Sequence, residues 1–142
     1  MAIDLRNEVF APVLARMKER KDSLRNMKRF PNAGIEGWLK VEVVAVLGDK
    51  VRALQNKGPD LLLEDGTKKG MGLELKASTN FARTYYLEPL YKYRVPCLFL
   101  SGDGTGRTGF PTTDQDDFEV VDCKVFSDGL GEWIIGLVKP RP

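Results

Sequence analysis

Two short apolar runs separated by a polar turn stand near the middle of the chain, at residues 61–63 and 71–75. A strand, a turn that contains glycine and a second strand together predict a β-hairpin. Side chains two residues apart on a strand share a face, so we expect Glu74 and Lys76 on one face of the second strand. Because that strand returns beside the start of the first, Asp60 should converge with Glu74 and Lys76 at one end of one sheet face.

Two helical segments are predicted before the hairpin. Apolar residues recur at helical spacing from Ile3 to Met27, where Asp4 can cap the segment and Pro12 should either kink it or begin a new helix. A second helix is predicted over residues 33–47, apolar almost all round and therefore buried on more than one side. A strand over residues 50–56 should follow it.

The chain after the hairpin predicts one more helix and three strands. Residues 81–93 are rich in tyrosine and should be helical in part. Residues 95–100 form a predicted buried strand, and residues 118–126 and 132–139 a C-terminal hairpin that extends the sheet or covers an edge. The glycine-rich stretch 101–109 lacks a Gly-Lys-Ser/Thr sequence, so we interpret it as a loop without a phosphate site.

Composition narrows the chemistry that this chain can perform. Its 142 residues fit one domain, and they contain no histidine. Serine and cysteine hydrolases with a catalytic histidine, and zinc or metal sites built on histidine, are therefore excluded. The two cysteines, Cys97 and Cys123, lie in apolar runs, which predicts two buried free thiols in a reducing compartment. With no signal-peptide pattern and no apolar stretch of membrane-spanning length, we expect a cytoplasmic protein without a membrane partner.

Charge is distributed unevenly although the net charge is only +2. Residues 16–29 hold seven basic side chains against two acidic ones, whereas residues 101–142 hold four basic against eight acidic ones. A basic front and an acidic tail favour a polyanionic partner on one face, and a solvated helix surface is the equally weighted alternative.

The expected meeting of Asp60, Glu74 and Lys76 carries a specific chemistry. Two neighbouring carboxylates repel each other and raise each other's pKa unless a cation lies between them. Oxygen ligands suit a hard divalent ion, Mg²⁺ or Mn²⁺, and a lysine beside such an ion can orient a water or stabilise charge that grows on phosphorus. These groups suffice for metal-assisted hydrolysis of a phosphodiester. A solvated hairpin with surface ion pairs is the plainer reading of the same residues.

The same residues resemble a known family. Pro59-Asp60, thirteen intervening residues and then Glu74-Leu75-Lys76 are similar to the signature of the PD-(D/E)xK nuclease superfamily, over roughly residues 33–100. The resemblance implies an α/β fold with a restriction-endonuclease-like core, a mixed sheet flanked by helices in the order αβββαβ, here with an N-terminal helix and a C-terminal β-hairpin. Residues 1–142 are then expected to form a single domain, with a basic helical segment (1–32), the core that carries the resemblance (33–100), a Gly/Asp-rich loop (101–117) and the hairpin (118–142).

The resemblance also implies an activity and its residues. It implies a Mg²⁺- or Mn²⁺-dependent endonuclease of the restriction, repair or junction-resolving type, with DNA as the expected substrate and a homodimer as an expected assembly. Asp60, Glu74 and the carbonyl of Leu75 would hold the metal, and Lys76 would act on the attacking water. The family's helix acid would be Glu36, which we place level with Asp60, or Glu42, about 9 Å further along at 1.5 Å per residue.

Candidate nucleic-acid contacts combine basic side chains with polar groups near the hairpin. In the sequence they are Arg16, Lys18, Arg20, Lys21, Arg25, Lys28, Arg29, Lys68, Lys69, Ser78 and Arg83. Two other functions remain open. One is a non-catalytic nucleic-acid-binding or scaffold protein that keeps the nuclease fold, and the other is a nucleotide-binding protein built on the loop at 102–109.

Overall fold

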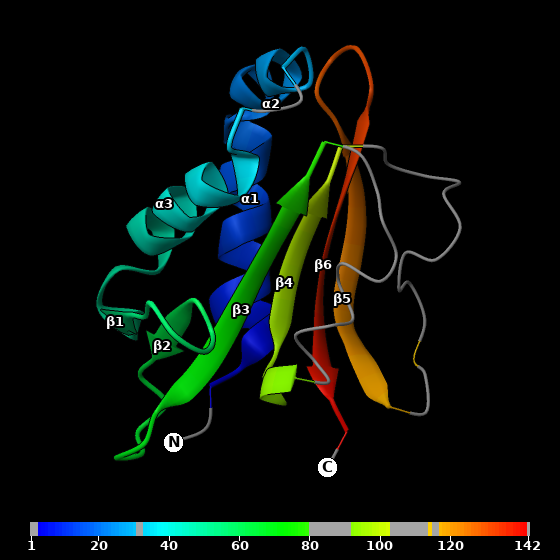
Figure 1. Cartoon of the computed structure of the whole chain (residues 1–142). Coiled ribbons are helices and arrows are strands. Elements are labelled where there is room, and N and C mark those ends of the chain that lie inside the picture. The colour runs from blue at the N-terminus through cyan, green and yellow to red at the C-terminus, as the bar shows by residue number, and fades with distance from the viewer. Residues whose placement is uncertain (1–2, 31–32, 80–91, 103–113, 115–116, 142) are drawn as a thin grey trace.

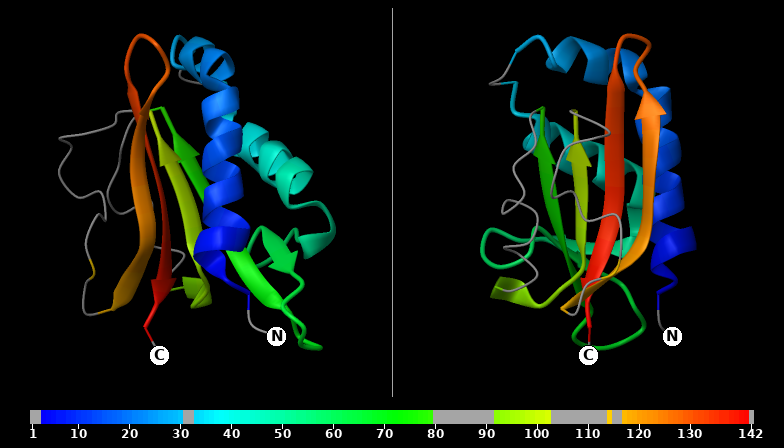
Figure 2. Two further views of the ribbon diagram at one scale, coloured as in Figure 1. Left: turned by 180° about the vertical axis from the view of Figure 1, so that it is seen from behind. Right: turned by 90° about the vertical axis from the view of Figure 1, so that its right-hand side faces the viewer.

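A six-stranded mixed sheet with helices on one of its faces forms the molecule (Figure 1). The computed structural model describes residues 3–30, 33–79, 92–102, 114 and 117–141. Viewed from the side, the helices α1, α2 and α3 lie behind the strands, and the two ends of the described chain lie at the same end of the sheet (Figure 2). The fold is therefore mixed α/β, as the sequence predicts.

The strands follow the spatial order β1-β2-β3-β4-β6-β5. β3 and β4 are parallel, and the other neighbouring pairs are antiparallel. The C-terminal hairpin extends the sheet, because β6 pairs with β4. The strand bounds are β1 (Val51–Leu54), β2 (Leu61–Leu63), β3 (Met71–Ser78), β4 (Cys97–Ser101), β5 (Phe118–Ser127) and β6 (Glu132–Pro140).

The N-terminal segment begins as a π-helix over Leu5–Phe10 and continues as α1 (Ala11–Glu19) and α2 (Lys21–Met27). Asp4 caps it by accepting a hydrogen bond from the backbone N–H of Asn7 at 3.1 Å, which confirms the predicted cap. Pro12 lies in the first turn of α1, but the chain before it is already helical, because Leu5–Phe10 is a π-helix and Phe10 has right-handed helical dihedral angles. The segment therefore changes from π-helix to α-helix just before Pro12, and no new helix begins at the proline.

The helix α3 spans Ile35–Leu47 and ends at Gly48, whose φ of 54° is readily adopted by glycine. As expected, it is buried on more than one side, because it packs against both α1 and β3 and only a narrow stripe faces solvent. Ile35, Leu39, Val43 and Leu47 form its buried stripe, whereas Val41 is 67% exposed. A 3₁₀ turn over Gly48–Lys50 follows, so the next strand is shorter than predicted and occupies only Val51–Leu54.

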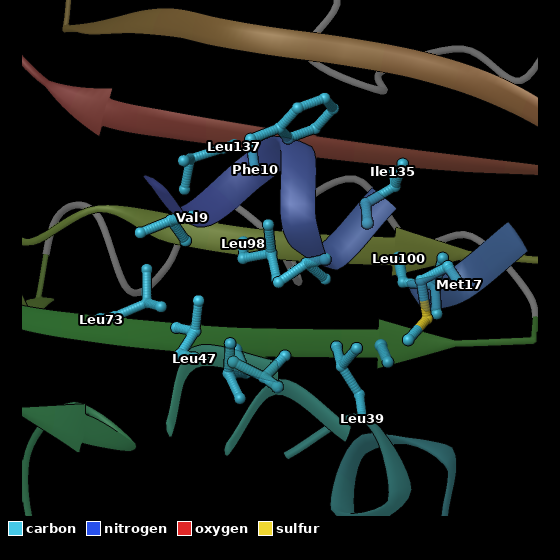
Figure 3. Packing of buried hydrophobic residues seen from close by; sticks show 14 of the residues in the cluster. Val9, Phe10, Met17, Leu39, Leu47, Leu73, Leu98, Leu100, Ile135 and Leu137 are labelled. Atoms are coloured by element: carbon cyan, nitrogen blue, oxygen red, sulfur yellow. The ribbon is translucent and has the colours of Figure 1, made fainter. Parts of the chain in front are cut away.

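The main core lies between the helices and the sheet (Figure 3). Val9 and Met17 from the N-terminal helices, Leu39 from α3 and Leu73 and Leu98 from the strands meet there, and each is fully buried. On the other face of the sheet, a smaller cluster contains Cys97, Phe99, Phe118, Ile134 and Val138. Burial on both faces explains why β4 is apolar from Cys97 to Leu100.

The two cysteines differ in exposure. Both are free thiols, but Cys97 is buried and Cys123 is only half-buried, so the prediction of two buried thiols holds for Cys97 alone. Burial, followed by the nearby charge of Glu74, raises the pKa of the Cys97 thiol well above its usual value. Cys97 therefore stays protonated at neutral pH.

The turn between β5 and β6 is pinned to α2 by one buried carboxylate. Asp128 accepts hydrogen bonds from the backbone N–H groups of Leu130 and Gly131 at 2.8 and 2.7 Å, and from the indole Nε1 of Trp133 at 2.8 Å. The Nζ of Lys28, the residue that follows α2, lies 3.4 Å from the same carboxylate. This contact ties the N-terminal helices to the C-terminal hairpin.

The predicted helical segment 81–93 lies almost entirely outside the described residues, and so does the loop at 103–113. The strand predicted after residues 81–93 is present as β4, and it lies parallel to β3. Within the part of the chain that the structure describes, no helix has the length and apolar character needed to cross a membrane.

Candidate functional site

The candidate site forms where β3 separates from β2. The two strands pair only at Leu61–Leu73, Leu62–Gly72 and Leu63–Met71. Beyond Leu73, backbone N–H groups on the edge of β3 that faces β2 donate to side chains instead of to a neighbouring strand. The N–H of Leu75 donates to Asp60 Oδ2 at 2.9 Å, and the N–H of Ala77 donates to Glu36 Oε1 at 3.3 Å. Carboxylates thus take the place of a paired strand along this edge.

Asp60 and Glu74 hold each other in position. Glu74 Oε1 accepts a hydrogen bond from the backbone N–H of Asp60 at 3.1 Å, while Asp60 Oδ2 accepts from Leu75, the next residue on β3. The chain before β2 is fixed as well, because Gln55 donates its backbone N–H to the carbonyl of Asp60 at 3.0 Å. The predicted proximity of Asp60 and Glu74 is therefore found in the structure.

The groups surround the edge of β3, and the expectation of a site on one sheet face is corrected. Leu73, Leu75 and Ala77 point into the main core, so Glu74 and Lys76 occupy the opposite face. Glu36 approaches from α3 on the helical face. Because β2 does not pair with β3 beyond Leu73, the edge of β3 is open there, and side chains can reach it from both faces of the sheet.

Glu74 is the most perturbed acid of this site. It is only 6% exposed. Burial raises its pKa first, the hydrogen bond and charge of Asp60 raise it further, and together they bring the pKa of Glu74 to about 8. The charge of Lys76 acts in the opposite direction and lowers the pKa of Glu74, which places the lysine within electrostatic reach of the acid. Lys76 therefore offsets only part of the effect of burial and of Asp60 on the pKa of Glu74.

A small cavity opens beside the carboxylates. It has a volume of about 210 Å³ and is lined by Glu36, Gly37, Lys40, Asp60 and Leu75. Lys40 places its Nζ 3.6 Å from Asp60 Oδ1, the oxygen that does not bond to Leu75. Sequence reasoning missed Lys40. The available signal was its spacing, because a residue four positions after Glu36 lies on the same face of a helix.

The two candidate helix acids have different surroundings. Glu36 lines the cavity, whereas Glu42 forms ion pairs with Arg16 Nε at 2.7 Å and Arg20 Nε at 3.2 Å. Six residues at 3.6 residues per turn place Glu42 well around the helix from Glu36, toward α1. The preference for Glu36 near Asp60 thus agrees with the structure, and Glu42 joins two helices instead.

The oxygen atoms at this edge suit a hard cation, although the set is small. Among the described residues no group of three or more histidine, cysteine or acidic side chains has the arrangement of a metal site. Asp60 and Glu74 supply two carboxylates, and the carbonyl of Leu75 points to the same edge as its N–H. Mg²⁺ often binds through one or two carboxylates and keeps several waters. The ammonium of Lys40 lies 3.6 Å from Asp60 Oδ1 at the same edge.

Four of the basic residues predicted to contact nucleic acid bind groups of this protein. Arg16 and Arg20 hold Glu42. Arg25 pairs with Asp22 at 2.8 Å and donates to the carbonyl of Asp128 at 2.9 Å, and Lys28 donates to the carbonyl of Glu132 at 3.0 Å. These side chains stabilise the contacts between helices and between α2 and the C-terminal hairpin.

The remaining candidates lie in three places. Lys18, Lys21 and Arg29 are exposed on and just after α1 and α2. Lys68 and Lys69 are exposed in the turn of the β2–β3 hairpin, and Ser78 is half-buried at the end of β3. Arg83 lies outside the described residues. Of these candidates, the exposed lysines and Arg29 remain available to a polyanion.

Comparisons with known proteins assign no family to this chain. No protein-family model matches the chain, and neither the curated proteins nor the solved structures contain a match to it. The residues around the edge of β3 are therefore the feature from which a function can be inferred.

Proposed function

We propose that the chain is a Mg²⁺- or Mn²⁺-dependent nuclease of the PD-(D/E)xK type, and that DNA is its substrate. The observation that carries the proposal is the meeting of Asp60 and Glu74 at the edge of β3, with Lys76 within electrostatic reach of Glu74. The order α3–β1–β2–β3, followed by a parallel β4, supports a restriction-endonuclease-like core.

Each residue has a role in this proposal. Asp60 Oδ1, Glu74 and the carbonyl of Leu75 would hold the divalent ion, with Glu36 nearby on α3. When bound, the ion would supply Lewis-acid stabilisation of the phosphate and a more acidic bound water. Backbone hydrogen bonds fix one oxygen of Asp60 and one of Glu74, so both carboxylates are oriented before any ligand arrives.

Lys76 would orient the attacking water and stabilise the negative charge that develops on the phosphoryl oxygens. Its position two residues after Glu74 keeps both side chains on one face of β3. A single site of this size cuts one strand, so a homodimer would supply the two sites needed for a duplex or a junction.

The test is Mg²⁺-dependent cleavage of a panel of plasmid, junction and single-stranded DNA, compared for the parent and Lys76→Ala. We expect a loss of at least about 10³-fold, because the charge that stabilises the transition state is removed. Lys124→Ala, which removes an exposed lysine of β5, is the matched control and should cut at the parent's rate.

Equal cleavage by Lys76→Ala and the parent would refute the role of Lys76. Binding of these DNAs without cleavage in Mg²⁺ or Mn²⁺ would favour the non-catalytic nucleic-acid-binding function instead. Thermal unfolding of both variants confirms that the fold is intact.

A further inference from the structure

Lys40 of α3 places a positive charge beside Asp60, one of the proposed metal ligands. Its Nζ lies 3.6 Å from Asp60 Oδ1, and the two side chains are 31% and 30% exposed. The other oxygen of Asp60 is engaged by the N–H of Leu75 at 2.9 Å. The ammonium therefore faces the one oxygen of Asp60 that a divalent ion would use.

The geometry points to Lys40 as a resident cation that competes with the divalent ion for Asp60 Oδ1 and turns to a phosphate of the nucleic acid when the ion binds. This inference rests on the proposed nuclease function. In this inference Lys40 is a positioning residue that couples two binding events. One is the binding of the metal ion to the carboxylates, and the other is the binding of a phosphate of the nucleic acid at the cavity.

The ion pair is suited to exchange. A half-exposed lysine–carboxylate pair is weak, so a divalent ion can displace the ammonium at modest cost. Lysine carries its charge on a flexible stem of four carbons, and Lys40 lines the mouth of a cavity of about 210 Å³. The displaced ammonium can thus reach outward to an anion without any movement of α3.

Exchange of this kind links the two ligands. Without nucleic acid, the divalent ion must break the Lys40–Asp60 pair and leave the ammonium without that carboxylate. With nucleic acid present, the same ammonium gains a phosphate oxygen as its partner. The phosphate therefore tightens metal binding, and by reciprocity the metal tightens phosphate binding.

The alternative acceptor near Lys40 does not remove this coupling. Glu36 lines the same cavity, and its Oε1 accepts the N–H of Ala77 at 3.3 Å, which holds that carboxylate against β3. A shift of the ammonium toward Glu36 would keep it beside the metal ligands, where like charges repel. The phosphate of a bound nucleic acid offers the lysine an anion further from the ion.

The experiment measures Mn²⁺ binding from the electron paramagnetic resonance signal of free Mn²⁺ at constant ionic strength. It compares the parent, Lys40→Met and Lys40→Arg, with and without a short phosphorothioate oligodeoxynucleotide that resists hydrolysis. Lys124→Met is the matched control, because it removes one exposed lysine from β5. Lys40→Gln is a second uncharged variant, and thermal unfolding in EDTA verifies each fold.

We expect Lys40→Met and Lys40→Gln to bind Mn²⁺ about fivefold more tightly than the parent without the oligonucleotide, since no ammonium has to be displaced. Lys40→Arg and Lys124→Met should keep the parent's affinity. The oligonucleotide should tighten Mn²⁺ binding to the parent more than to Lys40→Met.

Two other outcomes contradict the inference in different ways. If Asp60→Asn weakens Mn²⁺ binding but the Lys40 variants match the parent, the metal site stands and the role of Lys40 is refuted. If neither the parent nor Lys40→Met binds Mn²⁺ in a manner that depends on Asp60, both the resident-cation role and the proposed metal-dependent function fail.

Discussion

Asp128 and Glu74 are both withdrawn from water, and their surroundings move their pKa values in opposite directions. Asp128 is fully buried in the β5–β6 turn, and Glu74 is 6% exposed on β3. Burial acts on both in the same sense, since it disfavours the charged form. The difference must therefore come from the groups that each acid contacts.

Asp128 is surrounded by donors. Burial alone would raise the pKa of Asp128, but hydrogen bonds from Leu130, Trp133 and Gly131 and the charge of Lys28 outweigh it and lower the pKa to about 2. Every contact comes from the protein itself. The acid is a structural anchor whose charge is fully compensated.

Asp60 acts on Glu74 in two opposite ways. The backbone N–H of Asp60 donates to it, but the side chain of Asp60 brings a second carboxylate close, and the pKa of Glu74 rises to about 8. A buried acid beside another acid has too little compensating charge. Strongly perturbed acids of this kind gather at binding and catalytic sites, which supports the proposed cation at the edge of β3.

Removal of the Asp128 carboxylate should have the largest effect on stability. Asp128→Ala should lower the free energy of unfolding by about 3 kcal/mol, because it leaves buried donors without an acceptor. The unfolding midpoint measured by circular dichroism should fall by roughly 10 °C. Asp22→Ala, which removes an exposed acid of α2 with 72% side-chain exposure, should cost less than about 1 kcal/mol. Equal losses in the two variants would contradict the anchor role.

Stability as a function of pH should show the opposite signs of the two acids. Asp128 has a pKa lowered from 3.8 to about 2, so it stabilises the fold above pH 3.8 and loses about 2 kcal/mol as the pH falls toward 2. Glu74 has a pKa raised from 4.5 to about 8, so its contribution is greatest below pH 4.5 and declines as the pH rises to 8.

The measurement is the unfolding midpoint in EDTA at pH 2.5 to 8.5 for the parent, Asp128→Asn and Glu74→Gln. The difference between parent and Asp128→Asn should shrink in acid, and Glu74→Gln should gain on the parent as the pH rises from 5 to 8. A parent and a Glu74→Gln variant with parallel profiles would show that Glu74 titrates normally.

The smallest expected effect distinguishes the two acids of α3. Glu42→Gln should destabilise the protein by about 1 kcal/mol, because it weakens charge-assisted hydrogen bonds from Arg16 and Arg20, and it should leave Mg²⁺-dependent cleavage unchanged. Glu36→Gln should do the reverse and reduce cleavage about tenfold at nearly constant stability. Chemical denaturation and initial cleavage rates on the same samples measure both. Loss of cleavage in Glu42→Gln alone would reverse the assignment.

The sequence was sufficient where local pairing determines position. Alternation and glycine turns predict both hairpins, and the pairing of Leu61 with Leu73 places Asp60 beside Glu74. It was insufficient where packing decides. The apolar surface of α3 gives no clear face in the sequence, so the exposure of Val41 and the pairing of Glu42 with Arg16 follow only from contact with α1.

The position of the strand edge was also beyond sequence reasoning, and with it the contact between Lys40 and Asp60, for a related reason. The hairpin pattern indicates that β2 and β3 pair, but it does not indicate where they separate. The point of separation decides which N–H groups of β3 seek side-chain acceptors and how closely α3 approaches. The predicted helix over residues 81–93 and the contact by Arg83 remain predictions.

Because β2 begins only at Leu61, the edge of β3 beyond Leu73 has no strand beside it, and this has a consequence for how the region can change over evolution. Asp60 and Glu36 are held by the main chain at positions 75 and 77, and the main chain is the same whatever residue stands there. Leucine and alanine at these positions can therefore be exchanged to suit the core without disturbing the acids. Only proline, which has no N–H to offer, would release a carboxylate from its support.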